Sequence, residues 1–278
     1  MGSSKVFLFY AITLALAVLA RLALPAIGDG ILPLTMLTPA IAAAIMLAFI
    51  APEGGFRAAI ASLGLTRAGL KAWPLGIGGP VLIQALGALI LVALGLTQLT
   101  TPAAAVGISA AADFAAGLFI GTAFALGEEA GWRGYMLPRM RGFGLVQAML
   151  LVGFLHGVWH LPILLTTDLY HSGGNPWIIA PLFLLTLTLA GIFYGFLRLW
   201  TGSVWPVAIA HAAANMAWEF SAQMSQTKSA MVLEYIGGES GVIEIAGLLI
   251  VDLVLIRLMR DWTLDGPRPL PGTSVRVH

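Results

Sequence analysis

Long apolar segments recur along the chain, and short polar stretches separate them. Each segment is close to the roughly 20 residues that an α-helix needs to cross the hydrocarbon core of a bilayer. The segments run over Val6–Ile27, Leu32–Ala51, Trp73–Leu96, Phe114–Leu137, Val146–Thr166, Trp177–Trp200, Val204–Met224 and Val242–Met259. The pattern predicts an all-α, polytopic membrane protein with about eight transmembrane helices.

The two ends of the chain carry different signals. Lys5 precedes the first apolar run as a basic residue precedes the core of a signal peptide, but the run continues past Arg21 to Ile27. We therefore expect a retained first helix within one transmembrane domain over residues 1–262. Residues 263–278 contain several prolines and no hydrophobic period, which predicts a disordered cytoplasmic tail.

Basic residues predict the orientation of the helices, because Lys and Arg concentrate in cytoplasmic loops. If both termini share one side, that side collects Lys5, Arg57, Arg67, Lys71, Arg133, Arg139, Arg141, Arg198, Arg257, Arg260, Arg268 and Arg276. The opposite loops offer only Lys228. We therefore expect both termini in the cytoplasm. The loop Arg57–Lys71 mixes apolar and basic residues, so it is either an interfacial helix on the inner leaflet or an ordinary loop.

Composition strengthens the membrane assignment and narrows the chemistry. The chain is 59% hydrophobic and only 10% charged, with a mean hydropathy of +0.93, which leaves too little polar surface for a soluble protein of 278 residues. A formal charge of +1 without a basic cluster argues against nucleic-acid binding. The absence of cysteine excludes disulfides, thiolate catalysis and cysteine-ligated metals. We expect an integral protein of the cell membrane.

Two adjacent carboxylates stand where hydrocarbon is expected, in the fourth predicted span. On a helix, Glu129 and Arg133 lie four residues apart in the orientation that favours an ion pair, whereas Glu128 points roughly 100° away. Unpaired ionisable groups at membrane depth cost about 2.5–3.5 kcal/mol on insertion scales, so Glu128 is a candidate functional residue. Glycines spaced along the same span predict close helix packing: Gly117, Gly121, Gly127 and Gly131.

Polar pairs one helical turn apart also occur in the fifth and seventh predicted spans. His156 and His160 share a face of the fifth, and His211 and Asn215 share a face of the seventh. At about 1.5 Å per residue, Glu128 and His160 differ in depth by about 6 Å, while His211 lies nearer the cytoplasmic surface. We expect the three spans to meet at one polar site, which requires a tilt of the helices.

The residues present restrict the hydrolytic chemistry. The chain has neither a His-Glu-x-x-His zinc helix nor a Gly-x-Gly-Asp aspartyl motif. The serine-protease-like run Gly238–Gly241 is followed by a single span without histidine, so we interpret it as a turn. Water activated by a carboxylate remains, with a histidine to share the proton. His211 and Asn215 offer N–H groups for an oxyanion, each worth about 2.7–4 kcal/mol.

At these residues the chain resembles the intramembrane glutamate proteases related to the CAAX prenyl endopeptidase, also called the CAAX protease and bacteriocin-processing family. The family motifs are Glu-Glu-x-x-x-Arg, an aromatic residue followed four positions later by His, and His-x-x-x-Asn. The matching residues are Glu128, Glu129, Arg133, His160, His211 and Asn215, within roughly Gly117 to Asn215. His156 stands at the aromatic position, where we favour a packing role over a polar contact to substrate.

The resemblance implies an intramembrane endopeptidase that needs no cofactor or metal. It implies that Glu128 and His160 activate a water, that Glu129 supports the site with Arg133 fixing it, and that the His-x-x-x-Asn pair stabilises the oxyanion. In the best-known members the substrate is a prenylated protein cleaved after its lipidated cysteine. The implied partners are therefore membrane lipid and a protein or peptide substrate, lipidated or not, at a site facing the cytoplasmic leaflet.

Two other interpretations use the same residues. Glu128, His160 and His211, with or without His156, are a chemically acceptable zinc ligand set with one open position. A transporter or a membrane scaffold with a polar core is the non-enzymatic alternative. No repeat relates the two halves of the chain, which disfavours a transporter.

Overall fold

The computed structural model describes most of the chain, and its regular structure is almost entirely helical. The described residues are 2–28, 31–50, 55–100, 104–140, 142–169, 171, 173–227, 229–264 and 266. Besides turns and loops, these residues include two isolated β-bridges. The all-α prediction is confirmed. Residues 265 and 267–278, most of the tail that we expected to be disordered, lie outside the described residues.

A helix lies at every apolar segment that the sequence marked. The α-helices are α1 (Gly2–Ile27), α2 (Ile31–Met36), α3 (Thr38–Ile45), α4 (Phe56–Ser62), α5 (Trp73–Ala93), α6 (Ala104–Glu129), α7 (Leu145–Leu164), α8 (Pro176–Thr201), α9 (Trp205–Met224) and α10 (Val242–Leu258). Shorter π- and 3₁₀-helical turns extend them at Met46–Ile50, Leu70–Ala72, Ala130–Met136, Leu137–Arg139 and Met231–Ile236. The short α4 lies in the loop that we interpreted as either interfacial helix or ordinary loop.

Six helical segments within the described residues are long and apolar enough to cross a membrane, so this is a helical membrane protein. They are Ser4–Ala23, Pro33–Ile50, Leu70–Ala93, Ser109–Arg139, Leu145–Leu164 and Pro176–Thr201. The seventh and eighth predicted spans form α9 and α10, which are not among the six. The 17-residue α10 is short for a span, and α9 carries the polar His211, Asn215 and Glu219.

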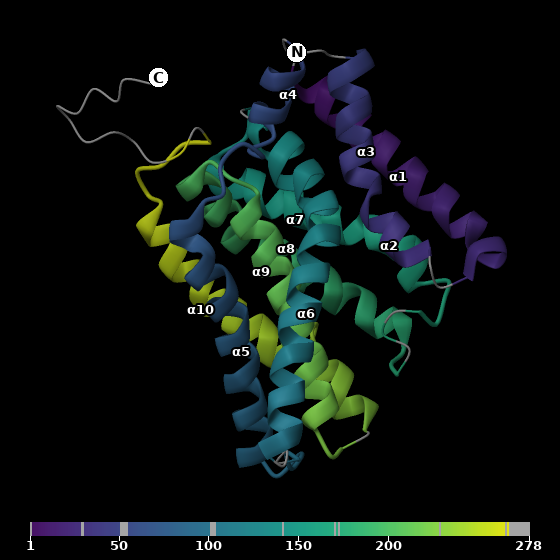
Figure 1. Ribbon diagram of the computed structural model, residues 1–278, viewed down its shortest axis with the longest axis vertical. Helices are drawn as coiled ribbons and strands as arrows, with labels where there is room; N and C mark the ends of the chain where they lie inside the picture. The colour runs from purple at the N-terminus through teal and green to yellow at the C-terminus, as the bar shows by residue number, and fades with distance from the viewer. Residues whose placement is uncertain are drawn as a thin grey trace.

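Two central helices, α8 and α9, hold the fold together (Figure 1). α8 packs against α7 and α10, while α9 packs against α5 and α6. The first three helices lie along one side of the molecule, where α3 contacts α6 and the π-helical turn after it. The largest fully buried side chains include Trp132 and Tyr135 of that turn, and both rings contact Phe9 of α1.

Glycines permit the close approach of the helices that carry the polar residues. A Cβ added at Gly127 or Gly131 would meet Met36 to Pro39 of the α2–α3 segment at under 3 Å. A Cβ at Gly117 would collide with Met216 of α9. The close packing predicted for this span is therefore confirmed, and it brings the Glu pair against neighbours on two sides.

We predict that Gly153→Ala destabilises the protein, because α7 and α8 touch at this position. The added Cβ would collide with the carbonyl oxygen of Leu187 and lie 2.9 Å from Cα of Thr188. We expect a cost of about 1–3 kcal/mol, the usual range for overpacking. The measurement is thermal unfolding in detergent.

Gly78→Ala is the matched control for this prediction. Gly78 also lies inside a helix, but a Cβ there has no heavy atom within 4 Å. Both substitutions gain the same helix propensity, about 1 kcal/mol, so their difference reports the helix contact. Equal stabilities of the two variants would contradict the proposed contact.

Candidate active site

The Glu pair lies where α6 changes into a π-helical turn. α6 ends at Glu129, and Ala130–Met136 continues with π-helical hydrogen bonding. The side chains of Glu128 and Glu129 are 1% and 0% exposed. Single π-turns inside helices are frequent at functional sites, since they shift the register of the side chains beyond the turn. The sequence predicted a continuous helix here and gave no signal for the change.

Arg133 neutralises Glu129, as predicted. Its Nη1 donates to both carboxylate oxygens of Glu129, at 3.1 and 3.0 Å, and both side chains are buried. The guanidinium also lies over the ring of Tyr194 in α8, 4.9 Å from the ring centre. Nε of Arg198 donates to the backbone carbonyl of Arg133 at 3.1 Å. The neutralised acid is therefore fixed from its own helix and from α8.

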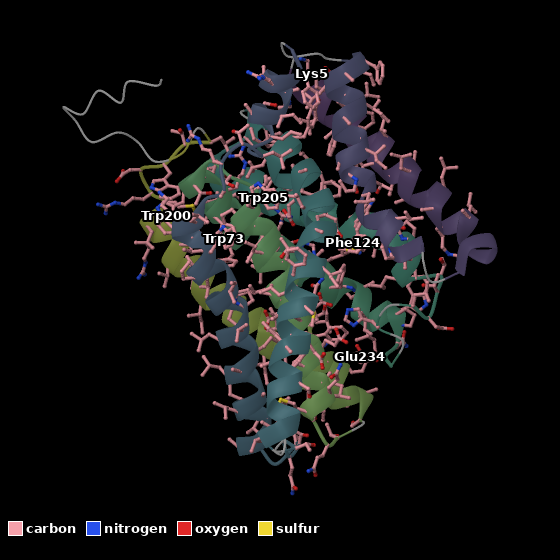
Figure 2. The ribbon with its side chains drawn as sticks, viewed as in Figure 1. Lys5, Trp73, Phe124, Trp200, Trp205 and Glu234 are labelled. Carbon is pink, nitrogen blue, oxygen red and sulfur yellow. The ribbon has the colours of Figure 1, made fainter. Side chains whose placement is uncertain are left out.

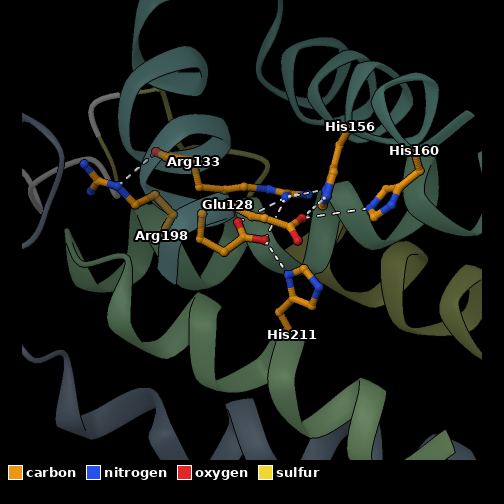
Figure 3. Close-up of polar contacts among 7 residues, drawn as sticks. Glu128, Arg133, His156, His160, Arg198 and His211 are labelled. Atoms are coloured by element: carbon orange, nitrogen blue, oxygen red, sulfur yellow. Dashed lines mark hydrogen bonds and ion pairs between the residues drawn. The ribbon is translucent and has the colours of Figure 1, made fainter. Parts of the chain in front are cut away.

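His156 joins Glu128 to Arg133 (Figure 3). Its Nε2 lies 2.7 Å from Oε2 of Glu128, and its Nδ1 lies 3.1 Å from Nη1 of Arg133. Because a guanidinium can only donate, Nδ1 accepts and the ring proton is on Nε2, which donates to Glu128.

The packing role that we favoured for His156 is therefore incomplete. The ring does stack on Trp132, with centroids 5.2 Å apart and planes at 28°. However, both ring nitrogens also make polar contacts, and these contacts are with protein side chains rather than with a substrate. The spacing of His156 and His160 predicted a shared face but not this second function.

His160 approaches the same carboxylate oxygen from the next helical turn. Its Nε2 lies 3.9 Å from Oε2 of Glu128, which is longer than a hydrogen bond. The rings of Trp159 and Phe183 contact the imidazole edge to face, with centroids 4.6 and 5.2 Å away. The side chain of His160 is 22% exposed, whereas Glu128 is 1% exposed. Of Glu128 and His160, His160 is therefore the more exposed side chain.

His211 brings α9 to the site through the other acid. Its Nδ1 lies 3.0 Å from Oε1 of Glu129, and its ring stacks on Tyr194 with the planes 16° apart. Asn215 lies one helical turn further along α9. We predicted that the fourth, fifth and seventh spans meet at one polar site, although residue spacing is a weak guide to such a meeting. These contacts confirm the prediction.

A cavity of about 390 Å³ joins these residues. Most of its wall is aliphatic and aromatic, and it comes mainly from α5, α7 and α8, with α10 adding Leu248 and Val251. The polar residues that line it are Thr35, Gln84, Glu128, His156, His160, Thr186, Tyr194, His211, Asn215, Glu239 and Glu244. An apolar pocket with a few convergent polar groups is the usual form of a binding or catalytic site.

The turn Gly238–Gly241 is confirmed as a turn, with the backbone N–H of Gly241 donating to the carbonyl of Gly238 at 2.9 Å. Glu239 of this turn nevertheless lines the cavity, as does Glu244 of α10, which accepts a hydrogen bond from Gln84. No sequence motif connected Glu239 to the site. Its position is accompanied by a contact distant in sequence, 3.3 Å from its Oε2 to Nε2 of His171, which residue spacing does not encode.

A metal ion would meet one favourable and one unfavourable feature here. Glu128, His156 and His160 offer ligand atoms that all lie within 4.8 Å of one another. To ligate through Nε2, His156 would have to move its proton to Nδ1, which faces Nη1 of Arg133. Two donors would then oppose each other at 3.1 Å. His211, expected in the zinc set, contacts Glu129 instead. The residues present fit a metal poorly.

Comparison with known protein families agrees with this geometry. Residues 109–217 match the family model described as Type II CAAX prenyl endopeptidase Rce1-like. The matched region includes the Glu pair, both histidines of α7 and the His-x-x-x-Asn motif of α9. A search of curated proteins finds no match. The resemblance inferred from the three motifs is confirmed, and the chain carries an Rce1-like domain of the type II CAAX prenyl endopeptidase family.

Proposed function

We propose that this protein is an intramembrane endopeptidase in which Glu128 and His160 activate the water that attacks a peptide bond. The family implies a peptidase that acts on protein or peptide substrates. The observation that carries the proposal is the position of Glu128: one carboxylate oxygen accepts from His156 at 2.7 Å and lies 3.9 Å from Nε2 of His160, beside the cavity. The gap to His160 is suited to a water that both groups contact.

The reaction consumes one water per bond cleaved. Glu128 takes a proton as the water oxygen bonds to the carbonyl carbon, and the carbonyl π electrons move to the oxygen. When the tetrahedral intermediate collapses, the C–N bond breaks and the proton passes to the leaving nitrogen through Glu128 or His160. The products are a carboxylate and an amine. His156 holds Glu128 in place, so the carboxylate reaches the water from a fixed position.

His211 and Asn215 are the oxyanion donors in this mechanism. Nδ1 of His211 donates to Glu129, which leaves Nε2 as the nitrogen for substrate. Nε2 carries a proton at the same time only if the ring is an imidazolium. Two buried carboxylates, Glu128 and Glu129, face one guanidinium at this site, and a second cation on His211 balances the charge. The same ring is thus both a neutraliser of Glu129 and a donor to the oxyanion.

We also propose that residues 1–262 form one membrane domain with eight spans and both termini in the cytoplasm. α9 and α10 pack against candidate spans, which supports counting them as spans. In Figure 2, Lys5 lies near the top of the molecule, and Trp73, Trp200 and Trp205 lie below it in the upper half. Tryptophan and lysine are typical of the membrane interface, and lysine favours its cytoplasmic side.

Glu128→Gln and Glu128→Ala test the mechanism. We expect hydrolysis of lipidated and transmembrane peptides to fall by about 10²–10⁴-fold in both, since the amide and the methyl group cannot take the proton. Glu219→Gln, which alters an exposed carboxylate bonded to Gln223, is the control and keeps wild-type turnover. Retained turnover in folded Glu128→Gln would refute the mechanism.

His156→Phe separates packing from polar function at the aromatic position. Phenylalanine keeps a ring against Trp132 but loses the contacts with Glu128 and Arg133. We expect kcat to fall by about tenfold to a hundredfold, because a supporting group that positions a reacting one has this weight. KM changes little. Wild-type kcat in His156→Phe would assign the residue to packing alone.

Metal removal distinguishes the water mechanism from the zinc alternative. We expect full activity after dialysis against a strong chelator and less than one equivalent of zinc per chain in the purified protein, because Arg133 fixes the His156 proton on the nitrogen that a metal needs. Activity that is lost in chelator and restored by zinc would establish a metalloprotease.

A further inference from the structure

A second cluster of ionisable groups lies outside the motifs and connects two segments that are far apart in sequence. His171, between α7 and α8, places Nδ1 2.8 Å from Oε2 of Glu234 and Nε2 3.3 Å from Oε2 of Glu239. The imidazole side chain is 2% exposed. Close by, the backbone N–H of Asn175 donates to the hydroxyl of Tyr235 at 2.6 Å. Three contacts thus fasten the α7–α8 connection to the segment between α9 and α10.

The cluster is built for a charged histidine. A neutral imidazole has one N–H, and only the imidazolium presents a proton to both carboxylates. Burial alone would lower the pKa of His171, but Glu234 and Glu239 raise it to about 9. His160 of α7 also interacts with it electrostatically. α8 and α9 present the rings of Phe183 and Trp218 to it rather than charges. His171 is therefore a cation at neutral pH.

The backbone shows that His171 is held in this position. Its φ is 55°, the only positive value for a non-glycine residue among those that the structure describes. Left-handed backbone is unfavourable at such a residue and persists where the surroundings hold it in place. The two ion pairs of His171 with Glu234 and Glu239 hold the backbone in this conformation.

Two contacts lead from this cluster to the catalytic residues. The ring of Phe183 lies between two imidazoles, 5.8 Å from that of His171 and 5.2 Å from that of His160, and both contacts are edge to face. Glu239, the second carboxylate of the cluster, forms part of the cavity wall. In Figure 2, Lys5 and Glu234 lie in opposite halves of the molecule, and Glu234 lies in the half that holds the α7–α8 connection.

We propose that His171, paired with Glu234 and Glu239, is a latch that closes one end of the cavity and, through Phe183, holds His160 in position for hydrolysis. We call these three residues the His171 latch. His171 is a positioning residue, since it reaches the reacting atoms only through Phe183 and Glu239. The inference rests on the proposed function of Glu128 and His160. Nothing in the family motifs contains the latch, whose residues lie before α8 and after α9.

The test compares His171→Asn and His171→Lys with the wild-type enzyme over a range of pH. Asparagine tolerates the left-handed backbone but carries no charge, whereas lysine keeps the charge with an ordinary pKa of about 10.4. We expect kcat of His171→Asn to fall by about tenfold to a hundredfold at neutral pH, with a smaller change in KM. His171→Lys retains most of the wild-type kcat.

The fall of kcat at alkaline pH tests whether the positive charge of His171 is required. Wild-type kcat falls as pH rises through about 9, where His171 loses its proton. In His171→Lys this alkaline limb of the kcat profile moves up by about one pH unit, and His171→Asn lacks the fall in kcat that the residue-171 proton causes. A residue with a merely structural role would not move the limb. Wild-type kcat in His171→Asn, or an identical limb in all three proteins, overturns the inference.

Thermal unfolding gives a readout that does not need activity. The pKa of His171 is raised from 6.5 to about 9, so its contribution to stability is complete below about pH 6.5 and is lost as pH rises through about 9. The unfolding temperature of the wild type therefore falls over this window more than that of His171→Asn; equal falls refute the latch. If the latch passes this measurement but hydrolysis does not depend on Glu128, the proposed function fails and its positioning role fails with it.

Discussion

The guanidinium of Arg133 is the group on which the rest of the site depends. It is buried, donates to both oxygens of Glu129, faces Nδ1 of His156 and lies over the ring of Tyr194. Removing one partner of such a buried pair costs about 3–5 kcal/mol, because the other charge is left uncompensated. Without Arg133, two adjacent carboxylates would stand in an apolar interior, and His156 would be free to adopt either tautomer. The same cation thus neutralises one acid and determines how the other is hydrogen-bonded.

This arrangement explains how the neighbouring glutamates Glu128 and Glu129 come to lie in different environments. Glu129 is enclosed by Arg133 and His211, so its lone pairs are committed to fixed donors. Glu128 accepts one bond from His156 and faces the cavity, where water and substrate can reach it. Sequence geometry predicted this division, since on a helix only one of two adjacent residues can face the arginine four positions on. The π-turn after Glu129 preserves the pair and changes the register of the residues beyond it.

Hydropathy predicted the helices because a bilayer demands a fixed length of apolar helix, and local spacing predicted the ion pair of Glu129 and Arg133. The features that the sequence could not predict depend on contacts between helices. The tautomer of His156 is set by a residue of another helix, and Glu239 reaches the cavity only through the packing of its turn. For this reason the expected packing role of His156 was incomplete. The aromatic position of the motif predicts a ring, but the hydrogen bonds of the ring nitrogens depend on residues of other helices.

Of the two residues that we propose to activate water, His160 is the more exposed, and aromatic rings enclose its imidazole. Glu128 is anchored by His156 at 2.7 Å, whereas the Nε2 of His160 lies 3.9 Å from the same oxygen and its ring is enclosed by Trp159 and Phe183. Aromatic packing restricts the tilt of an imidazole ring through its faces and edges rather than through its nitrogens. In the proposed mechanism, His156 fixes the carboxylate of Glu128, and the rings of Trp159 and Phe183 fix the imidazole of His160. Any contact that fixes Phe183 then bears on hydrolysis, although it touches neither the water nor the scissile bond.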